Sequence, residues 1–294
     1  MAVRALYDVA APAKLNLFLH VIGRRADGYH LLQSLFVLID WCDTLHFELR
    51  GDGQLARHDL NTTLPNEDLC LRAARALQTA SGTPLGADIS IEKRVPWGAG
   101  LGGGSSDAAS TLLALNRLWG LRWPRSRLMA LGLQLGADVP FFLGGNNAFV
   151  EGIGERLTPV RVAPVWLAVI KPAASIETRA IFGSSLLVRY TDAVILEGLS
   201  AEVSGGLGEF EFGRNDLQPP AEAACAEVTQ AAEVLRRCFG NSRMTGSGSA
   251  VFARASAGAA EPPMVAMPAD LAPGWVGRMC RGLEQHPLLG WADD

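Results

Sequence analysis

A run of glycines in the first half of the chain is the pattern best suited to chemistry. Five of the seven residues from Gly98 to Gly104 are glycine, so several backbone N–H groups can turn toward one point without side-chain interference. An alternating strand pattern precedes the run and an amphipathic helix pattern follows it. The helix N-terminus would add free N–H donors and the positive end of a dipole, with Ser105, Ser106 and Asp107 as candidate caps. The pattern predicts a phosphate-binding loop.

Other interpretations of the loop are weaker. A flexible linker would not usually be flanked so closely by a strand and a helix. Gly98, Gly100 and Gly103 satisfy the dinucleotide fingerprint GxGxxG, but that motif requires an acidic residue about 20 positions later. No acidic residue occurs between Asp107 and Asp138. A Walker loop is excluded because no Gly-Lys-Ser/Thr follows the glycines.

The spacing of the loop resembles the phosphate loop of the GHMP kinases, a family that includes galacto-, homoserine, mevalonate and phosphomevalonate kinases. The resemblance implies that the chain uses ATP, with Mg²⁺ accompanying the nucleotide, and that a loop serine, here Ser106, helps to place the metal. Trp97 stands where relatives often have a smaller or more flexible residue, so packing near the nucleotide should differ. The resemblance assigns ATP binding to Pro96, Trp97, Gly98, Ala99, Gly100, Leu101, Gly102, Gly103, Gly104, Ser105 and Ser106.

A second motif near the N-terminus is more specific than the glycine loop. The segment PAKLNL, followed by DGYHLLQ, resembles one branch of the family, whose members phosphorylate a cytidine diphosphate derivative of methylerythritol. By this resemblance, Lys14 and Asn16 line the reaction centre, while Tyr29 and His30 hold the cytosine ring. Taken singly, these residues could be a strand-edge charge, a turn former, a surface aromatic and a loop histidine. Their joint occurrence favours the functional interpretation.

Asp138, in the segment GADVPFF, is the candidate catalytic carboxylate. Phosphoryl transfer to an alcohol requires a group near the hydroxyl that accepts or orients its proton. The resemblance implies that Lys14 lies close to Asp138 and stabilises charge on the transferred group. The ordinary alternative for Asp138 is a turn residue at a helix end.

Two more features match the same family. Gly246, Ser247 and Gly248, in MTGSGSAVFA, resemble its second glycine-rich loop, which closes on the reaction centre from the other lobe. Alone, this segment would be a bulge or a tight turn. Phe182 matches the position of a second aromatic residue that would enclose the cytosine together with Tyr29. Without the resemblance, Phe182 would be a core residue.

One position departs from the family pattern, and the role of another is not decided by the sequence. Asp68 stands where relatives often have asparagine, which puts any adenine contact of that asparagine in doubt. Lys93 precedes the glycine loop and could reach a phosphate, or could be a surface lysine at a strand end. The chain has only three lysines, at 14, 93 and 171, so each one is of interest.

Composition restricts the classes of protein. A net charge of -4 argues against binding to a nucleic-acid backbone. No apolar run approaches the roughly 18 residues of a membrane span, and no export signal is visible. The five cysteines show no metal or disulfide spacing, which indicates reduced thiols in a cytoplasmic protein. We expect a small-molecule substrate, with no membrane or nucleic-acid partner and no obligate protein partner.

The local patterns predict mixed strands and helices. We expect strands over 15–23, 32–41, 44–50, 87–93, 147–152 and 165–172, and a strand pair within 243–255. We expect helices over 67–80, 108–119, 125–136 and 219–239, with Gly136 as a left-handed cap and Asp138 in a loop. The Ala- and Pro-rich tail after residue 255 gives no clear pattern.

These elements favour an α+β fold over a doubly wound sheet. The resemblance implies a two-lobed GHMP kinase fold, with a ribosomal protein S5 domain 2-like lobe over residues 1–160 and a ferredoxin-like lobe over residues 161–294. It also implies phosphorylation of the 2-hydroxyl of the cytidine substrate, a step in non-mevalonate isoprenoid synthesis. The alternatives are a kinase of the homoserine or mevalonate type, or a catalytically silent nucleotide-binding module.

Overall fold

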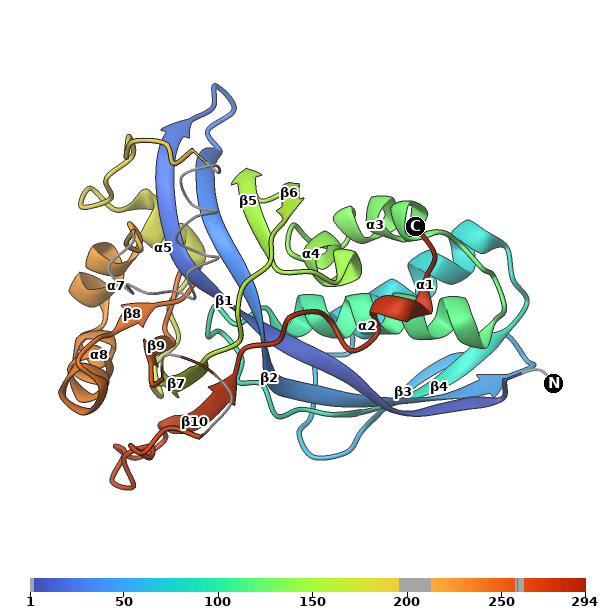
Figure 1. Cartoon of the computed structure of the whole chain (residues 1–294). Helices are drawn as coiled ribbons and strands as arrows, with labels where there is room; N and C mark the ends of the chain where they lie inside the picture. Colours follow the sequence, from blue (N-terminus) through green and yellow to red (C-terminus); the bar gives the residue numbers. More distant parts are fainter. Residues whose placement is uncertain (1–2, 196–212, 257, 259–261) are drawn as a thin grey trace.

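The computed structural model describes residues 3–195, 213–256, 258 and 262–294. These residues form two sheets with helices packed against them (Figure 1), as expected for the α+β class. The sheet of the first lobe runs β3-β4-β2-β5-β6, with β1 also paired to β2, and that of the second lobe runs β10-β7-β9-β8. The strands are β1 (Ala5–Arg24), β2 (His30–Arg50), β3 (Leu55–Asp59), β4 (Gly86–Glu92), β5 (Ala148–Gly152), β6 (Arg156–Pro159), β7 (Trp166–Lys171), β8 (Arg243–Met244), β9 (Val251–Arg254) and β10 (Val276–Arg281). The helices are α1 (Leu69–Ser81), α2 (Gly103–Leu118), α3 (Arg125–Leu133), α4 (Val139–Gly144), α5 (Thr178–Gly183), α7 (Gln218–Ala224), α8 (Ala226–Phe239) and the 3-10 turn η1 (Leu289–Trp291).

Two long antiparallel strands connect the lobes. β1 and β2 extend along most of the molecule (Figure 1) and pair over nearly their whole length. The prediction of two strands over 32–41 and 44–50 is wrong, because β2 is continuous through both. Asp40 and Asp43 suggested a polar break between strands, but both lie within β2. Asp43 is completely buried, and its carboxylate is satisfied by hydrogen bonds and an ion pair.

Helices α1 to α4 cover one face of the first sheet (Figure 1). Their apolar faces and the inward side chains of the sheet form one core that includes Phe47, Leu77, Leu112 and Leu115. α2 begins one turn earlier than predicted: its N-cap is Gly102, in the left-handed conformation, and no side chain caps the helix. Ser105, Ser106 and Asp107 are therefore not caps but lie within the helix.

Helix α3 ends at Leu133, before the predicted boundary. Gly136 does not adopt the left-handed conformation that the prediction gave it; its carbonyl accepts the N–H of Val139 as α4 begins. A Cβ atom at Gly132 would lie 2.6 Å from Leu143, so this glycine allows the two helices to pack closely. Asp138 lies in the turn between α3 and α4, as expected, and is the N-cap residue of α4; the residues after it, expected in the same loop, are helical. A six-residue helix is too short to show helical periodicity, which is why the sequence did not reveal it.

The second lobe packs α8 and neighbouring helices against its four-stranded sheet around Ile170, Leu235, Met244 and Val251. The single long helix predicted after residue 219 is instead α7 and α8. They are separated at Cys225, which has an extended backbone. The predicted strand pair is confirmed as β8 and β9. β10 was not predicted, because its residues alternate only weakly in polarity.

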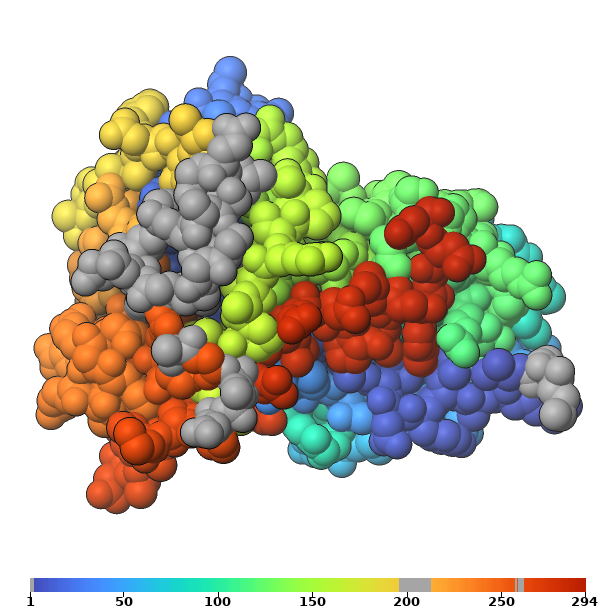
Figure 2. Space-filling view, viewed as in Figure 1, coloured from blue at the N-terminus to red at the C-terminus, as the bar shows by residue number. Residues whose placement is uncertain are grey.

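The C-terminal residues return to the first lobe. Figure 2 shows them (red) lying along its surface beside the green helices. Gly282 forms a bridge with Ile39, and Leu288 and Ala292 belong to the core of the first lobe. Arg125 is buried and donates to the backbone carbonyls of Leu289 and Ala292. Among the described residues, no helix is long and apolar enough to cross a membrane.

Candidate active site

Three hollows adjoin one another. The first, about 420 Å³, is lined by the glycine loop and by the start of α1. The second, about 310 Å³, shares Gly98, Gly100 and Gly102 with the first. The third is an open groove of about 750 Å³ that shares Thr178 and Phe182 with the second. The middle hollow therefore borders both the glycine loop and the groove.

The middle hollow brings together half of the predicted site residues. They come from β1, the glycine loop, α4, α5 and the β8–β9 connection. The predicted site residues that line it are Lys14, Asn16, Gly98, Gly100, Gly102, Asp138, Phe182, Gly246, Ser247 and Gly248.

Lys14 and Asp138 face each other in this hollow. The ammonium nitrogen lies 3.6 Å from a carboxylate oxygen, and the lysine side chain is 5% exposed whereas the aspartate is 31% exposed. The ammonium also donates to Asn16 Oδ1 at 2.6 Å and lies 4.4 Å from the ring centroid of Phe36. Burial lowers the pKa of Lys14, and attraction to Asp138 opposes the shift. The pair offers a fixed cation beside a carboxylate that solvent and substrate can reach.

The two glycine-rich loops meet backbone to backbone. A Cβ atom at Gly100 would lie 2.4 Å from the carbonyl oxygen of Thr245, and one at Gly246 would lie 3.1 Å from Gly100 Cα. Both glycines also have positive φ angles. The backbone N–H groups of Ser249 and Ala250 donate to carbonyls of the first loop. Glycine is required at this contact both for conformation and for space.

A hydrogen-bond network under the contact was not anticipated from the sequence. Thr245 Oγ1 accepts the backbone N–H of Asn16 at 2.9 Å, and Asn16 Nδ2 donates to Ser34 Oγ at 2.9 Å. The Ser34 hydroxyl donates to the carbonyl of Phe18. These side chains are buried. The network fixes the amide of Asn16, and through it the ammonium of Lys14. No spacing in the sequence indicates that Thr245 would reach this strand.

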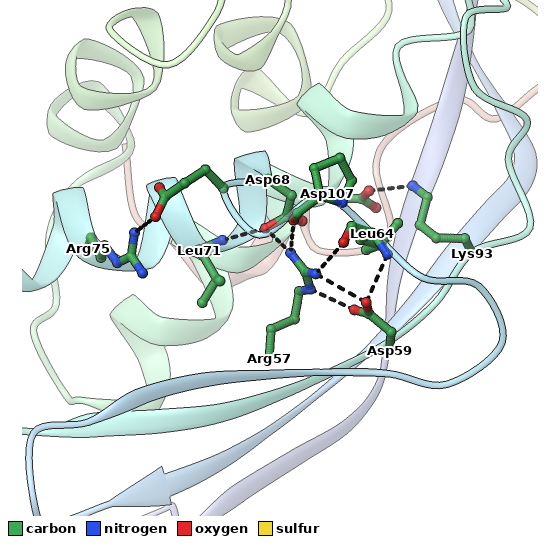
Figure 3. Close-up of polar contacts among 10 residues, drawn as sticks. Arg57, Asp59, Leu64, Asp68, Leu71, Arg75, Lys93 and Asp107 are labelled. Atoms are coloured by element: carbon green, nitrogen blue, oxygen red, sulfur yellow. Dashed lines mark hydrogen bonds and ion pairs between the residues drawn. The ribbon is translucent and has the colours of Figure 1, made fainter.

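Lys93 is neither at the surface nor free to bind a phosphate. Its ammonium contacts the carboxylates of Asp43 and Asp107, and its side chain is 6% exposed. Figure 3 shows it pointing at Asp107. Burial lowers the pKa of Lys93, but the two carboxylates more than offset this, so its pKa lies above the ordinary value. Burial raises the pKa of Asp107 above its ordinary value, and the attraction of Lys93 opposes this shift.

Asp68 lies on the wall of the first hollow, where the sequence left its role open. Arg57 donates to its carboxylate at 2.8 Å, and the backbone N–H of Leu71 donates to it at 3.0 Å (Figure 3). The same guanidinium pairs with Asp59 at 2.6 Å. The carboxylate of Asp68 thus caps α1 and is held by a side chain from β3.

The aromatic residues of the groove are arranged differently from the predicted sandwich. His30 stacks on Phe182, with centroids 5.1 Å apart and ring planes inclined by 25°. Tyr29 is 62% exposed at the rim of the same groove. Burial, with the nearby Arg189 and Arg24, lowers the pKa of His30. Its Nε2 atom is buried and has no hydrogen-bond partner among the described residues.

Ser106, the predicted metal-binding serine, is fully buried in α2, and its hydroxyl has no hydrogen-bond partner in the described part of the chain. Ser105, and not Ser106, lines the first hollow. Among the described residues, no group of three or more His, Cys, Asp or Glu side chains could hold a metal ion.

The fold and the paired glycine loops define a GHMP kinase. The profile of the GHMP kinases N terminal domain matches residues 68–146, and that of the GHMP kinases C terminal matches residues 197–262. A crystal structure of a homoserine kinase from Cytophaga hutchinsonii shares the fold, with a TM-score of 0.62 and 16% identity over 86% of this chain and 85% of that chain.

Two nearer relatives specify the branch. A 4-diphosphocytidyl-2-C-methyl-D-erythritol kinase of Methylibium petroleiphilum is 68% identical over 99% of this chain and 100% of its own length. A crystal structure of 4-(cytidine 5'-diphospho)-2C-methyl-D-erythritol kinase has a TM-score of 0.74 and 38% identity, covering 84% of this chain and 89% of that chain. The chain belongs to the 4-diphosphocytidyl-2-C-methyl-D-erythritol kinase family.

Proposed function

We propose that this chain transfers the γ-phosphoryl group of ATP to the 2-hydroxyl of 4-diphosphocytidyl-2-C-methyl-D-erythritol. The observation that carries the proposal is the position of the Lys14–Asp138 pair. It lies in the hollow that joins the glycine loop to the groove of His30 and Phe182. ATP would occupy the first hollow with its phosphates over the glycine loop, and the cytidine end of the acceptor would occupy the groove.

The reaction follows from this placement. The acceptor hydroxyl would lie beside Asp138, which accepts or orients its proton. The hydroxyl oxygen then bonds to the γ-phosphorus while the bond from that phosphorus to the β–γ bridging oxygen breaks, which releases ADP. The ammonium of Lys14 faces the transferred group and offsets its negative charge. Asn16, fixed by Thr245 and Ser34, holds the ammonium in place.

Magnesium belongs to the proposal as a companion of the nucleotide. When bound, it would neutralise charge on the β- and γ-phosphates. The residue proposed to support it is Ser106, whose buried hydroxyl has no hydrogen-bond partner within the described part of the chain. The proposed ATP-binding role of residues 96–106 rests on the backbone N–H groups of the loop and the first turn of α2.

The cytidine end of the substrate is assigned to Tyr29, His30 and Phe182. The ring contact between His30 and Phe182 supports a flat, base-sized binding surface. The Nε2 atom of His30, which has no hydrogen-bond partner among the residues described, offers a hydrogen bond that can help to choose the base. A homoserine or mevalonate substrate would have no use for these rings. A silent binding module would not require the Lys14–Asp138 pair.

The domain division and the cellular location also remain proposals. We place the boundary between the lobes near residue 160, with the tail from Gly282 onward packed on the first lobe. The described cysteines are all free thiols, which supports a cytoplasmic location.

The test is ADP release by the purified protein with ATP and magnesium. Diphosphocytidyl-methylerythritol is compared with homoserine, mevalonate and galactose as acceptors. Activity with the cytidine compound alone supports the proposal. Activity with another acceptor would keep the kinase chemistry and overturn the substrate. Nucleotide binding without turnover of any acceptor would favour the silent module.

A further inference from the structure

We propose that Lys93 is a positioning residue for ATP, because its ammonium fastens both ends of the phosphate loop to β2. The inference rests on the proposed function, since it concerns how the nucleotide site of that reaction is held in shape. Three residues form what we call the Lys93 cluster: Asp43 in β2, Lys93 after β4 and Asp107 in α2.

The cluster holds the chain where it enters the loop. Asp43 Oδ1 accepts the backbone N–H groups of Arg94 at 2.5 Å and Val95 at 2.8 Å, while its Oδ2 contacts the Lys93 ammonium. The indole N–H of Trp41, also on β2, donates to the carbonyl of Arg94 at 2.7 Å. Residues 93–95 are therefore fixed to β2 immediately before the loop begins.

The same ammonium holds the chain where it leaves the loop. Asp107 lies near the start of α2, and one oxygen of its carboxylate contacts Lys93. The backbone at Gly103 rests on the cluster: a Cβ atom there would lie 3.1 Å from Val95 Cγ1 and 3.6 Å from Asp43 Oδ2. The loop from Pro96 to Gly102 thus spans two segments that one buried cation ties together.

This arrangement explains how Lys93 acts without touching a phosphate. The Lys93 side chain borders the first hollow, but two carboxylates already occupy its ammonium. We therefore attribute its effect on ATP to the position of the loop N–H groups. Loss of the ammonium would leave two carboxylates buried against each other, which strongly disfavours their packed arrangement. The first turn of α2 would then separate from β2, and misplaced loop groups bind the phosphates poorly.

The first experiment compares Lys93→Met with Arg125→Met. Both variants lose a buried cation, but Arg125 lies outside the cleft and contacts the C-terminal segment. We expect Lys93→Met to raise the KM for ATP and the Kd for ADP about tenfold or more, with little change in the KM for the acceptor. Arg125→Met should lower the melting temperature and leave both nucleotide constants unchanged. An equal rise in both variants would overturn the proposal.

The second experiment separates positioning from stability and from direct phosphate binding. The double variant Lys93→Met/Asp107→Asn removes one of the two opposed carboxylates, so it should regain melting temperature but keep the raised Kd for ADP. Recovery of both would reduce the cluster to a stability element. Asp43→Asn removes one of the two carboxylates that hold the ammonium, while Asp107 keeps its contact with Lys93. We expect weaker ADP binding, because this link between the loop and β2 is weakened. Unchanged ADP binding would overturn the proposal, and tighter binding would mean that the less constrained ammonium binds phosphate directly.

The two proposals can fail separately. Binding of ADP, measured by calorimetry, requires no acceptor and reports on the loop alone. If the wild-type protein binds ADP but turns over no acceptor, the proposed function fails, while the comparison among Lys93→Met, Asp43→Asn and Arg125→Met still decides the role of the cluster.

Discussion

Lys14 and Asp138 are brought to within 3.6 Å of each other, from a strand of the first sheet and the start of a helix that covers it. The lysine is buried and the aspartate is open to the cleft. A buried cation next to an accessible carboxylate assigns the two residues different roles: one stabilises charge, and the other handles the proton of the acceptor.

Asp138→Asn should lower kcat by about 100-fold or more, because the amide cannot accept the proton of the hydroxyl. The KM for ATP and the Kd for ADP should change little, since Asp138 does not line the first hollow. Steady-state kinetics with the cytidine substrate give the result. Asp52→Asn, on an exposed carboxylate, is the control. Unaltered turnover in Asp138→Asn would remove this residue from the mechanism.

We expect the fall in kcat at alkaline pH, the alkaline limb of the pH–activity profile, to result from deprotonation of Lys14. Burial lowers its pKa below the ordinary 10.5, so the charge of Lys14 is lost at a lower pH than that of an exposed lysine. We expect kcat to fall as the pH rises through this shifted value. In Lys14→Arg the guanidinium stays charged, so the same limb should be missing from whatever activity survives. A limb that persists in this variant would have to come from another group.

The groove should lose substrate affinity when its rings are removed. Phe182→Ala and Tyr29→Ala should each weaken binding of the cytidine substrate by about 1 to 3 kcal/mol if both rings contact the base. Phe182→Tyr keeps the ring and serves as the matched control. Measurement of the acceptor KM at saturating ATP isolates the effect. If only Phe182→Ala weakens binding of the substrate, Tyr29, which is exposed at the rim, does not contact the cytosine.

Trp97 should report directly on the nucleotide. Trp97 is 51% exposed and lies on the wall of the first hollow, which the apolar residues Leu64 and Leu69 also line. We expect its indole to stack on the adenine, which would quench its fluorescence when ADP binds. Trp97→Phe should abolish that signal and retain most of the affinity, whereas Trp97→Ala should lose both. Equal quenching in wild type and Trp97→Phe would assign the signal to another tryptophan.

The sequence allowed prediction of local features and of the family motifs, because these depend on neighbouring residues. The strand–loop–helix order around Gly100 and the glycine contact at Gly246 are of this kind. It did not reveal the partners of Lys93, because Asp43 and Asp107 approach it only when β2, β4 and α2 are packed. The break at Cys225 and the continuity of β2 through Asp43 were missed because tertiary contacts override the local pattern.

The sequence likewise predicted some residues of the candidate site and missed others. Lys14, Asn16, Asp138 and Phe182 were found because their motifs are distinctive. Thr245 was missed, although it holds the strand that carries Lys14. A lone threonine next to a glycine loop has no spacing that identifies its partner, and its role depends on contact between the two lobes.

All three lysine side chains of the chain are buried. Lys14 and Lys171 are 4% and 5% exposed, and the side chain of Lys93 is 6% exposed. The Lys171 ammonium donates to the carbonyls of Pro172 and Ala174, beside the second glycine loop. Every lysine amine is thus enclosed near the cleft, and the exposed cationic side chains are guanidinium groups. Acylating reagents that modify accessible amines should spare these side chains in the native enzyme and react with them only when the cleft opens, so acylation rates would measure its opening.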